Sequence, residues 1–487
     1  MNTQTRFILA DSLFYLSWMI PVPVYMLFLI ETLPRQGQEI TVYCLGLVAS
    51  MWVHTTLGHL ADKLKSGLSA YSIAAGVTAL YGLIFVIAAV AVEPGNRLWL
   101  YAGGEALSTF GLLFYWGAFP KWFRASLEAE QTEPKPPEFF DKQFRKLITC
   151  RLMASLLGNV IGLGLWIFKM RPELIRLRDV LPNTKLNPAI SSDYFQWNPF
   201  TWSALVAIAA LAFGRLILGR ARKVATGSDD TSRSVLPTDS GTSLIPYPDG
   251  HQWPTGRMAW TFITKNPSVA GVIACAAALR VTLTTLIVFM PIYLNWVFPS
   301  YLKSSNPGTV FVFMCLFWVA VRIGQVFGNR ISAINGPGSL SFFLRALSLC
   351  FFLGLLGLAC IGLSPSFVAS FQSHFLTWVL AGIVTCFILF VLYGTLEPTV
   401  MDWITALAPP PIRGAVGAYA STIGSVFEVI SLILLQWISI GFSHAGQRSF
   451  PLLFTGASLV VLTLFLFALP LVMRFKNGRL ALPAPNP

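Results

Sequence analysis

Residues 58–67 read GHLADKLKSG, and this short charged stretch separates two long apolar runs. Charge is scarce elsewhere: 11% of the 487 residues are charged and 55% are hydrophobic, whereas soluble globular proteins contain about 25% charged residues. Runs of about 20 apolar residues, each long enough to cross a hydrocarbon core of about 30 Å, recur from one end of the chain to the other. The sequence therefore predicts an all-α polytopic membrane protein.

The apolar runs define about twelve candidate transmembrane helices. They cover roughly residues 8–30, 41–60, 70–92, 97–119, 147–169, 199–219, 267–297, 309–329, 339–363, 374–400, 414–441 and 451–473. The stretch between the sixth and seventh spans is rich in Ser, Thr, Asp, Gly and Pro, which is typical of a linker. We expect an N-terminal six-helix bundle over 1–215, a cytoplasmic linker over 216–265 and a C-terminal six-helix bundle over 266–487.

A net charge of +13 would raise the question of nucleic acid in a soluble protein. Here most Lys and Arg residues lie in the links between apolar runs, where they set the orientation of the chain. We count only Arg280 and Arg322 inside the predicted spans. The pattern predicts a multi-pass protein of the bacterial inner membrane or plasma membrane, with both termini cytoplasmic and no nucleic-acid partner. The link 169–198 fits this orientation worst, because it places several basic residues on the outer side.

The sequence carries none of the motifs of common enzymes or ATP-driven pumps. It has no phosphate-binding Gly-rich loop ending in Lys-Ser/Thr, no HExxH pair, no zinc-ligand spacing and no GxSxG elbow. The seven cysteines fall almost entirely inside apolar runs without a paired spacing, which is typical of packing residues. We therefore expect no enzymatic activity, no cofactor and no metal.

The opening stretch resembles the loop signature of the major facilitator superfamily, which lies between the second and third helices of its members. Gly58, Asp62 and Lys63 match that signature in register, whereas Lys65 stands where glycine is usual and a basic pair is missing after it. The segment PPPIRGAVGAYASTIG, from residue 409, is similar to the start of the eleventh helix in the same family. The resemblance covers nearly the whole chain and implies two six-helix halves that work by alternating access.

The resemblance also implies a conformational latch, formed by Gly58, Asp62 and Lys63 against Arg413 and Gly414. An acidic side chain that faces the exposed N–H groups of a helix N-terminus gains about 0.3–1 kcal/mol. A contact of this kind, made in one conformation and broken in the other, would bias a two-state equilibrium. The alternative is that the stretch is only a solvated link whose lysines set orientation.

Ionisable residues inside spans are costly and usually face a cavity or a partner. By resemblance, spans one, four, seven and ten line the central path, and Asp11, Glu105, Arg280 and Glu397 give each of them a charge. Glu105 and Arg280 lie near mid-depth, and we predict that they bind a polar substrate or pair across the two halves. A purely structural role is the alternative. The complete predicted substrate-binding set is Glu105, Arg280, Tyr15, Trp18, Tyr101, Thr109, Thr284 and Trp116.

Three acidic residues are candidates for proton coupling. Glu428 lies within an apolar helix, where a carboxylate shielded from water can take up a proton near neutral pH. Glu105 and Asp11 are the other two candidates.

Glu397 and Asp402 near the cytoplasmic end of span ten form a predicted inner gate. The alternative for the aromatic residues that follow Asp11, Tyr15 and Trp18 among them, is ordinary core packing.

These residues favour a secondary active transporter that moves a small organic solute, by proton-coupled uptake, as a monomer in the lipid bilayer. The acid and base among aromatic residues suit a zwitterion, a peptide-like solute, a nucleoside or an amphiphile. Span five carries Gly158, Gly162 and Gly164 but has Leu163 where drug antiporters of the family carry proline, which favours uptake. The alternatives are an efflux antiporter, a non-transporting sensor, and a lipid-modifying enzyme in which Asp11 pairs with His54.

Overall fold

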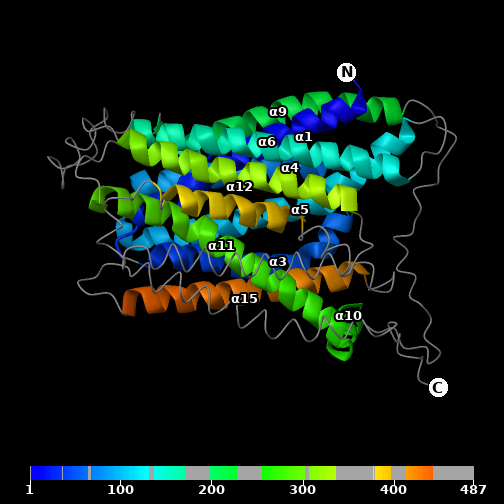
Figure 1. Cartoon of the computed structure of the whole chain (residues 1–487). Coiled ribbons are helices and arrows are strands. Elements are labelled where there is room, and N and C mark those ends of the chain that lie inside the picture. The colour runs from blue at the N-terminus through cyan, green and yellow to red at the C-terminus, as the bar shows by residue number, and fades with distance from the viewer. Residues whose placement is uncertain are drawn as a thin grey trace. The chain divides into compact units, whose positions relative to one another are not determined.

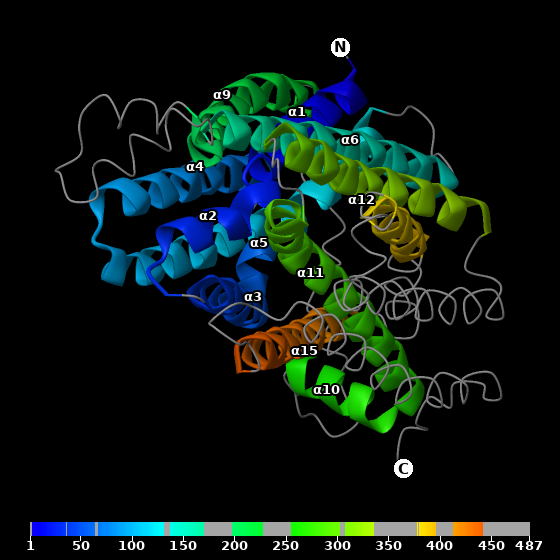
Figure 2. The same cartoon turned by 60° about the vertical axis from the view of Figure 1, so that its left-hand side comes forward.

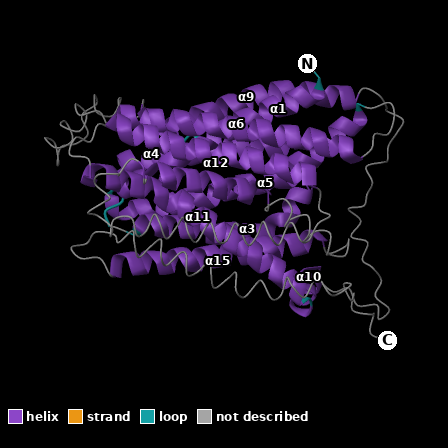
Figure 3. Cartoon of the chain, viewed as in Figure 1, coloured by secondary structure: helices purple, strands orange, loops and turns teal. Residues whose placement is uncertain are grey.

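The computed structural model describes residues 2–35, 37–63, 67–130, 137–169, 197–226, 255–301, 307–335, 377, 379–395 and 413–441. Figure 1 shows long helices, and within the described ranges there is no strand (Figure 3). The N-terminal elements are α1 (Thr3–Met19), η1 (Val22–Val24), α2 (Tyr25–Thr32), α3 (Gln38–Lys63), α4 (Gly67–Ala91), η2 (Pro94–Asn96), α5 (Arg97–Ala129), α6 (Pro137–Lys169) and α9 (Pro199–Thr226). They are followed by α10 (Thr255–Lys265), α11 (Pro267–Tyr301), α12 (Pro307–Asn335), the helical segment Val379–Thr395 and α15 (Arg413–Gly441).

Seven of the described helical segments are long and apolar enough to cross a membrane. The predicted spans that fall within the described ranges coincide with helices, but α5 ends ten residues after the predicted end of 97–119 and α6 begins ten residues before the predicted start of 147–169. The predicted spans 339–363 and 451–473 lie outside the described residues, as does nearly all of the link 169–198. Several helices, α6, α9, α11 and α12 among them, begin at a proline, where the missing N–H removes no helical hydrogen bond.

The chain folds into two units, and α11 and α12 contribute a part to each. Unit 1 comprises Met1–Asp230 and Ile287–Ile323, and unit 2 comprises Thr231–Leu286 and Gly324–Pro487. In unit 1, α4 packs against α5 and α9, while α1 packs against α6 and α9 (Figure 2). In unit 2, α10 packs against α15.

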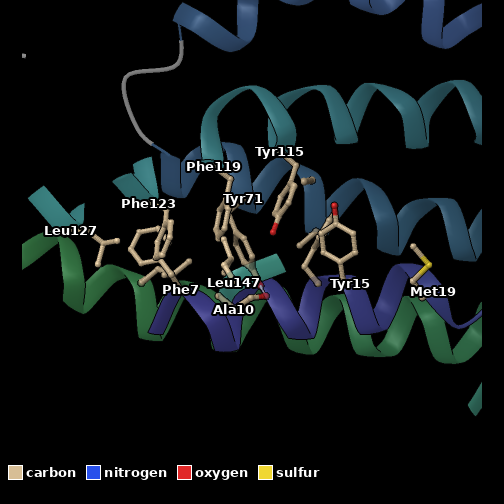
Figure 4. Packing of buried hydrophobic residues seen from close by; sticks show 14 residues of the cluster. Phe7, Ala10, Tyr15, Met19, Tyr71, Tyr115, Phe119, Phe123, Leu127 and Leu147 are labelled. Carbon is tan, nitrogen blue, oxygen red and sulfur yellow. Dashed lines mark hydrogen bonds between the residues drawn. The ribbon is translucent and has the colours of Figure 1, made fainter. Parts of the chain in front are cut away.

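An aromatic cluster fills the space between α1, α4 and α5 in unit 1 (Figure 4). The Tyr115 ring stacks on Phe14 and Phe119, with centroids 4.2 and 4.7 Å apart. The Tyr71 hydroxyl lies 3.1 Å from the carbonyl oxygens of Ala10 and Ala210, so this one side chain links α4 to both α1 and α9. Because lipid tails are as apolar as the core, close packing and interhelical hydrogen bonds of this kind hold membrane helices together.

The first predicted span is interrupted where Pro21 and Pro23 remove two backbone N–H groups. Helix α1 ends at Met19, and the chain passes through η1 before helix α2 begins. Helix α6 approaches this break through two glycines. A methyl group added to Gly162 would lie 1.8 Å from the Ile20 carbonyl oxygen, and one added to Gly158 would lie 2.8 Å from that of Leu16. The two backbones are therefore in direct contact at the break.

Candidate functional site

Asp11 is part of a buried charge pair that connects three helices of unit 1. The Arg151 guanidinium of α6 donates through Nε to Oδ2 and through Nη2 to Oδ1 of Asp11, at 3.0 and 2.9 Å. The Tyr115 hydroxyl of α5 also donates to Oδ1. Asp11 is fully buried, and the Arg151 side chain is only 16% exposed. This bidentate arrangement links α1 to α6, and the Tyr115 contact links the same carboxylate to α5.

The predicted residues Tyr15 and Trp18 lie next to this pair. The Arg151 guanidinium carbon is 4.4 Å from the centre of the Tyr15 ring, and Trp18 packs edge-on against Tyr15 at 5.7 Å. One turn further along α1, the Met19 sulfur accepts a hydrogen bond of 3.0 Å from Nη2 of Arg322. The segment of α1 from Tyr15 to Met19 therefore meets one guanidinium from α6 and another from α12, within unit 1.

Glu105 lies on α5 among neutral groups. The Tyr81 hydroxyl of α4 donates to its Oε1 at 2.8 Å. Gly46 of α3 faces the same side chain, and a methyl group added there would lie 2.9 Å from the Glu105 Cβ. Tyr101 lies one turn before Glu105 and is fully buried against Phe85, with ring centroids 4.7 Å apart. The described surroundings of Glu105 are thus the tyrosines Tyr81 and Tyr25 and closely packed helices of unit 1.

Arg280 and Glu428 belong to a second polar network, between α11 and α15 in unit 2. Nη1 of Arg280 donates to the Ser421 carbonyl at 2.9 Å, and it lies 3.4 Å from the hydroxyls of Ser421 and Ser425. The Thr284 hydroxyl, one turn along α11, donates to the Glu428 carboxylate. Gly424 lies between these contacts, where an added methyl group would be 3.0 Å from Nη1 of Arg280.

This second network forms a ladder with one rung per helical turn. Arg280 and Thr284 are four residues apart on α11, and they face Ser421, Ser425 and Glu428, which follow at intervals of four and three on α15. The spacing places all five side chains on the facing sides of the two helices. The predicted residues Arg280, Thr284 and Glu428 are therefore neighbours in the structure.

The other predicted residues are described only in part or not at all. Thr109 is half-buried on α5, and the side chain of Trp116 on the same helix is not described. Gly58, Asp62 and Lys63 are in the last two turns of α3, and Arg413 and Gly414 begin α15, but their side chains are not described either. Glu397 and Asp402 lie outside the described residues. The latch and the inner gate stay predictions.

Sequence reasoning missed the partners that complete both networks. Arg151 lies inside the predicted span 147–169 and Arg215 inside the span 199–219, so the count of Arg280 and Arg322 as the basic residues within spans is wrong. The sequence offers a partial signal, because Arg151 falls four residues inside the predicted start of the apolar span 147–169. Tyr81, Tyr115, Ser421 and Ser425 gave no signal of their own, because hydroxyl residues are common in apolar helices.

Comparison with known proteins places the chain by its fold. No family model matches the sequence, and no curated protein matches it either. A solved structure of the nucleoside transporter NupG matches with a TM-score of 0.63, over 98% of this chain and 100% of that one, at 13% identity. The chain has the major facilitator fold.

A second match supports the same conclusion. The structure of an auto-inhibited peptide transporter of the POT family is similar with a TM-score of 0.56, over 99% of both chains, at 12% identity. The predicted fold class, an all-α polytopic membrane protein of the major facilitator type, is therefore confirmed. In this major facilitator fold, the Asp11–Arg151 pair and the Arg280–Glu428 network lie within helices that coincide with candidate membrane spans.

Proposed function

We propose that the protein is a secondary active transporter that moves a small organic solute across the membrane by alternating access, coupled to proton uptake. The observation that supports this most directly is the set of ionisable side chains held inside membrane helices of both units. Such groups are costly in a bilayer and in known proteins mark solute or proton pathways. An inert membrane scaffold would be expected to replace them with apolar residues at no loss of stability.

The two units differ in how they hold their carboxylates, and this difference ranks the proton-coupling candidates. Asp11 is fixed by two hydrogen bonds from a guanidinium, which favours the charged form. Glu105 and Glu428 accept from the hydroxyls of Tyr81 and Thr284, which can accept from a protonated carboxyl as well as donate to a charged one. Tyr25 also lies beside Glu105 and Arg280 is a charged neighbour of Glu428, but in the described structure neither carboxylate is held bidentately by a guanidinium. We therefore propose Glu105 and Glu428 as the proton-coupling residues and Asp11 as a structural residue.

The first solutes to test are nucleosides, followed by short peptides. The solved structures that share this fold include a nucleoside transporter and a peptide transporter. Nucleosides and short peptides are small molecules with several hydrogen-bonding groups. Guanidinium, hydroxyl and aromatic side chains can bind such molecules. We propose a monomer with both termini on the cytoplasmic side.

Counterflow in proteoliposomes tests the proposal. Purified protein is reconstituted into liposomes, and exchange is measured as entry of labelled solute into liposomes preloaded with unlabelled nucleoside or dipeptide. Net uptake is measured as entry of labelled solute into empty liposomes, with and without an inward proton gradient. We expect the gradient to accelerate net uptake by the parent protein. In Glu105→Gln or Glu428→Gln, exchange of solute should persist while the effect of the gradient is lost. Glu128→Gln is the matched control, because Glu128 is exposed and pairs with Arg124 on the same helix turn.

Two results would contradict the proposal. The absence of counterflow for every solute in a broad panel would rule out transport and favour a sensor. Net uptake that still responds to the proton gradient in both Gln variants would rule out coupling through these two carboxylates.

A further inference from the structure

Unit 1 contains buried polar groups that the networks described above do not use. Asn159 on α6 is fully buried, and within the described part of the chain neither its Oδ1 nor its Nδ2 has a hydrogen-bond partner. Trp318 on α12 is also fully buried, and its Nε1 has no partner within the same residues. Buried polar groups in native proteins are almost always satisfied, so each exception calls for strain, function or a bound molecule as its explanation.

Asn159 and Trp318 are connected through a short series of contacts. Asn159 follows Gly158, and a methyl group added to Gly158 would lie 3.1 Å from the Met19 Cβ. The Met19 sulfur accepts from Arg322, whose guanidinium carbon is 5.8 Å from the centre of the Trp318 ring. Trp318 is therefore linked through Arg322 to Met19 of α1, and Asn159 directly follows the α6 residue that meets the same Met19. Tyr15 and Met19 extend from the same side of α1 in Figure 4.

The chemistry gathered here is that of a site for a planar heterocycle. A carboxamide presents a donor and an acceptor side by side, which is how Asn and Gln pair bidentately with the N6 and N7 edge of adenine. An indole N–H adds a single donor. Aromatic rings and guanidinium planes provide the surfaces on which nucleic-acid bases stack, and Tyr15, Trp318 and Arg322 are groups of this kind.

A charged zwitterion fits these groups less well. The guanidinium of Arg151 is already held bidentately by Asp11, so it is not available to a substrate carboxylate in this arrangement. The orphan groups of Asn159 and Trp318 carry no charge, so they offer no countercharge to a zwitterion. The Arg322 guanidinium also lies in this group of residues, so the preference for an uncharged ring rests on the neutral donor and acceptor atoms of Asn159 and Trp318.

We propose that Asn159, with Trp318 and Tyr15, determines substrate specificity by recognising the hydrogen-bonding edge of a nucleobase, with adenine as the best match. This inference rests on the proposed transport function and names the solute class of that function. It assigns Asn159 the bidentate contact with the base edge, and it assigns the rings of Trp318 and Tyr15 the contact with the base plane.

The assignment is tested by comparing two solutes, which differ at the base edge, in the parent protein and in variants of Asn159. Dissociation constants for adenosine and for 7-deazaadenosine, which lacks the N7 acceptor, are measured by scintillation proximity on the full-length purified protein. In the parent, adenosine should bind about tenfold more tightly than the deaza analogue, as expected for one good base-edge pair. In Asn159→Leu, both solutes should bind equally weakly, with no fall in thermal stability because a buried orphan group has been removed.

Two further variants make the result decisive. Ser155→Ala is the matched control: it removes a polar group one turn away on the same helix, but that hydroxyl already donates to the Arg151 carbonyl at 2.9 Å. It should keep the tenfold preference. Asn159→Asp replaces the amide by a carboxylate, which only accepts hydrogen bonds when it is ionised. It should lose the preference in the same way as Asn159→Leu, which keeps the test valid if the leucine variant does not fold.

The outcomes separate this inference from the proposed function. If the parent transports adenosine and either Asn159 variant keeps the tenfold preference, the assignment of Asn159 is wrong while the transport proposal stands. If counterflow occurs only for solutes that lack a base edge, such as dipeptides, the nucleobase inference is likewise wrong and transport stands. If no solute moves at all, the proposed function itself fails.

Discussion

The buried pair between Asp11 and Arg151 predicts a specific pattern of stability loss and rescue. Arg151→Met leaves the fully buried Asp11 carboxylate without its two guanidinium hydrogen bonds, at 2.9 and 3.0 Å in the parent. Hydrogen bonds to charged groups contribute about 1.5–3 kcal/mol each, which gives about 3–6 kcal/mol for the two. Breaking a buried ion pair by removing one partner costs about 3–5 kcal/mol, in agreement with that sum. We expect a loss within this range.

Removing both partners should restore most of the stability. Replacing a buried ion pair by apolar residues of similar volume is often neutral, so Asp11→Leu combined with Arg151→Met should come within about 1–2 kcal/mol of the parent. The residual loss arises from the Tyr115 hydroxyl, which would lose its acceptor on Asp11. Adding Tyr115→Phe should recover that part as well.

The free energy of unfolding is measured by SDS titration of the protein in mixed micelles, for the parent, both single variants and the double variant. The pair between Arg124 and Glu128 is the control, since it joins the same chemical groups but its side chains are 64% and 49% exposed. Its single variants should cost less than about 1 kcal/mol. The reasoning is refuted if Arg151→Met costs no more than the control, or if the two single losses simply add in the double variant.

Two other contacts give testable predictions. Gly162→Ala should destabilise the protein and block solute exchange, because the new methyl group would lie 1.8 Å from the Ile20 carbonyl oxygen, whereas Gly164→Ala has open space and should behave as the parent in thermal unfolding and counterflow. Tyr71→Phe should lower the free energy of unfolding by about 0.6–1.5 kcal/mol, because it removes the hydroxyl that links α4 to α1 and α9, and the same SDS titration would contradict this if the variant matched the parent.

The fold could be predicted from the sequence because the bilayer constrains each helix separately. The span predicted at 8–30 is observed as Thr3–Thr32 with a break at its two prolines, and the span predicted at 267–297 as Pro267–Tyr301. Length and apolarity alone set these boundaries. The family signature at Gly58 and Asp62 predicts that these helices are arranged in a major facilitator fold, and the similar solved structures confirm this fold.

For each polar pair in the site, the sequence predicts the charged residue but not the residue that partners it. A charge inside an apolar run is visible in the sequence, so Asp11, Glu105, Arg280 and Glu428 were all found. Their partners depend on which helices adjoin and how each is rotated, and no periodicity within one helix carries that information. Arg151 is 140 residues from Asp11 in the chain, and an arginine near the end of a predicted span is equally typical of a residue that extends to the membrane surface.

The two ways of holding a carboxylate suggest different roles in alternating access. A bidentate ion pair between α1 and α6 must stay intact, since separating it exposes two charges to an apolar interior, so these helices are expected to move together.

The ladder between α11 and α15 has no such requirement. Its donors, Arg280 and Thr284, face three acceptor residues spaced by about one turn, Ser421, Ser425 and Glu428. A shift of one turn would offer Arg280 the Ser425 carbonyl in place of that of Ser421 and would release Thr284 from Glu428. On the proposed function, the ladder between α11 and α15 is therefore the element that can change partners as Glu428 gains or loses its proton, while the pair between α1 and α6 stays fixed.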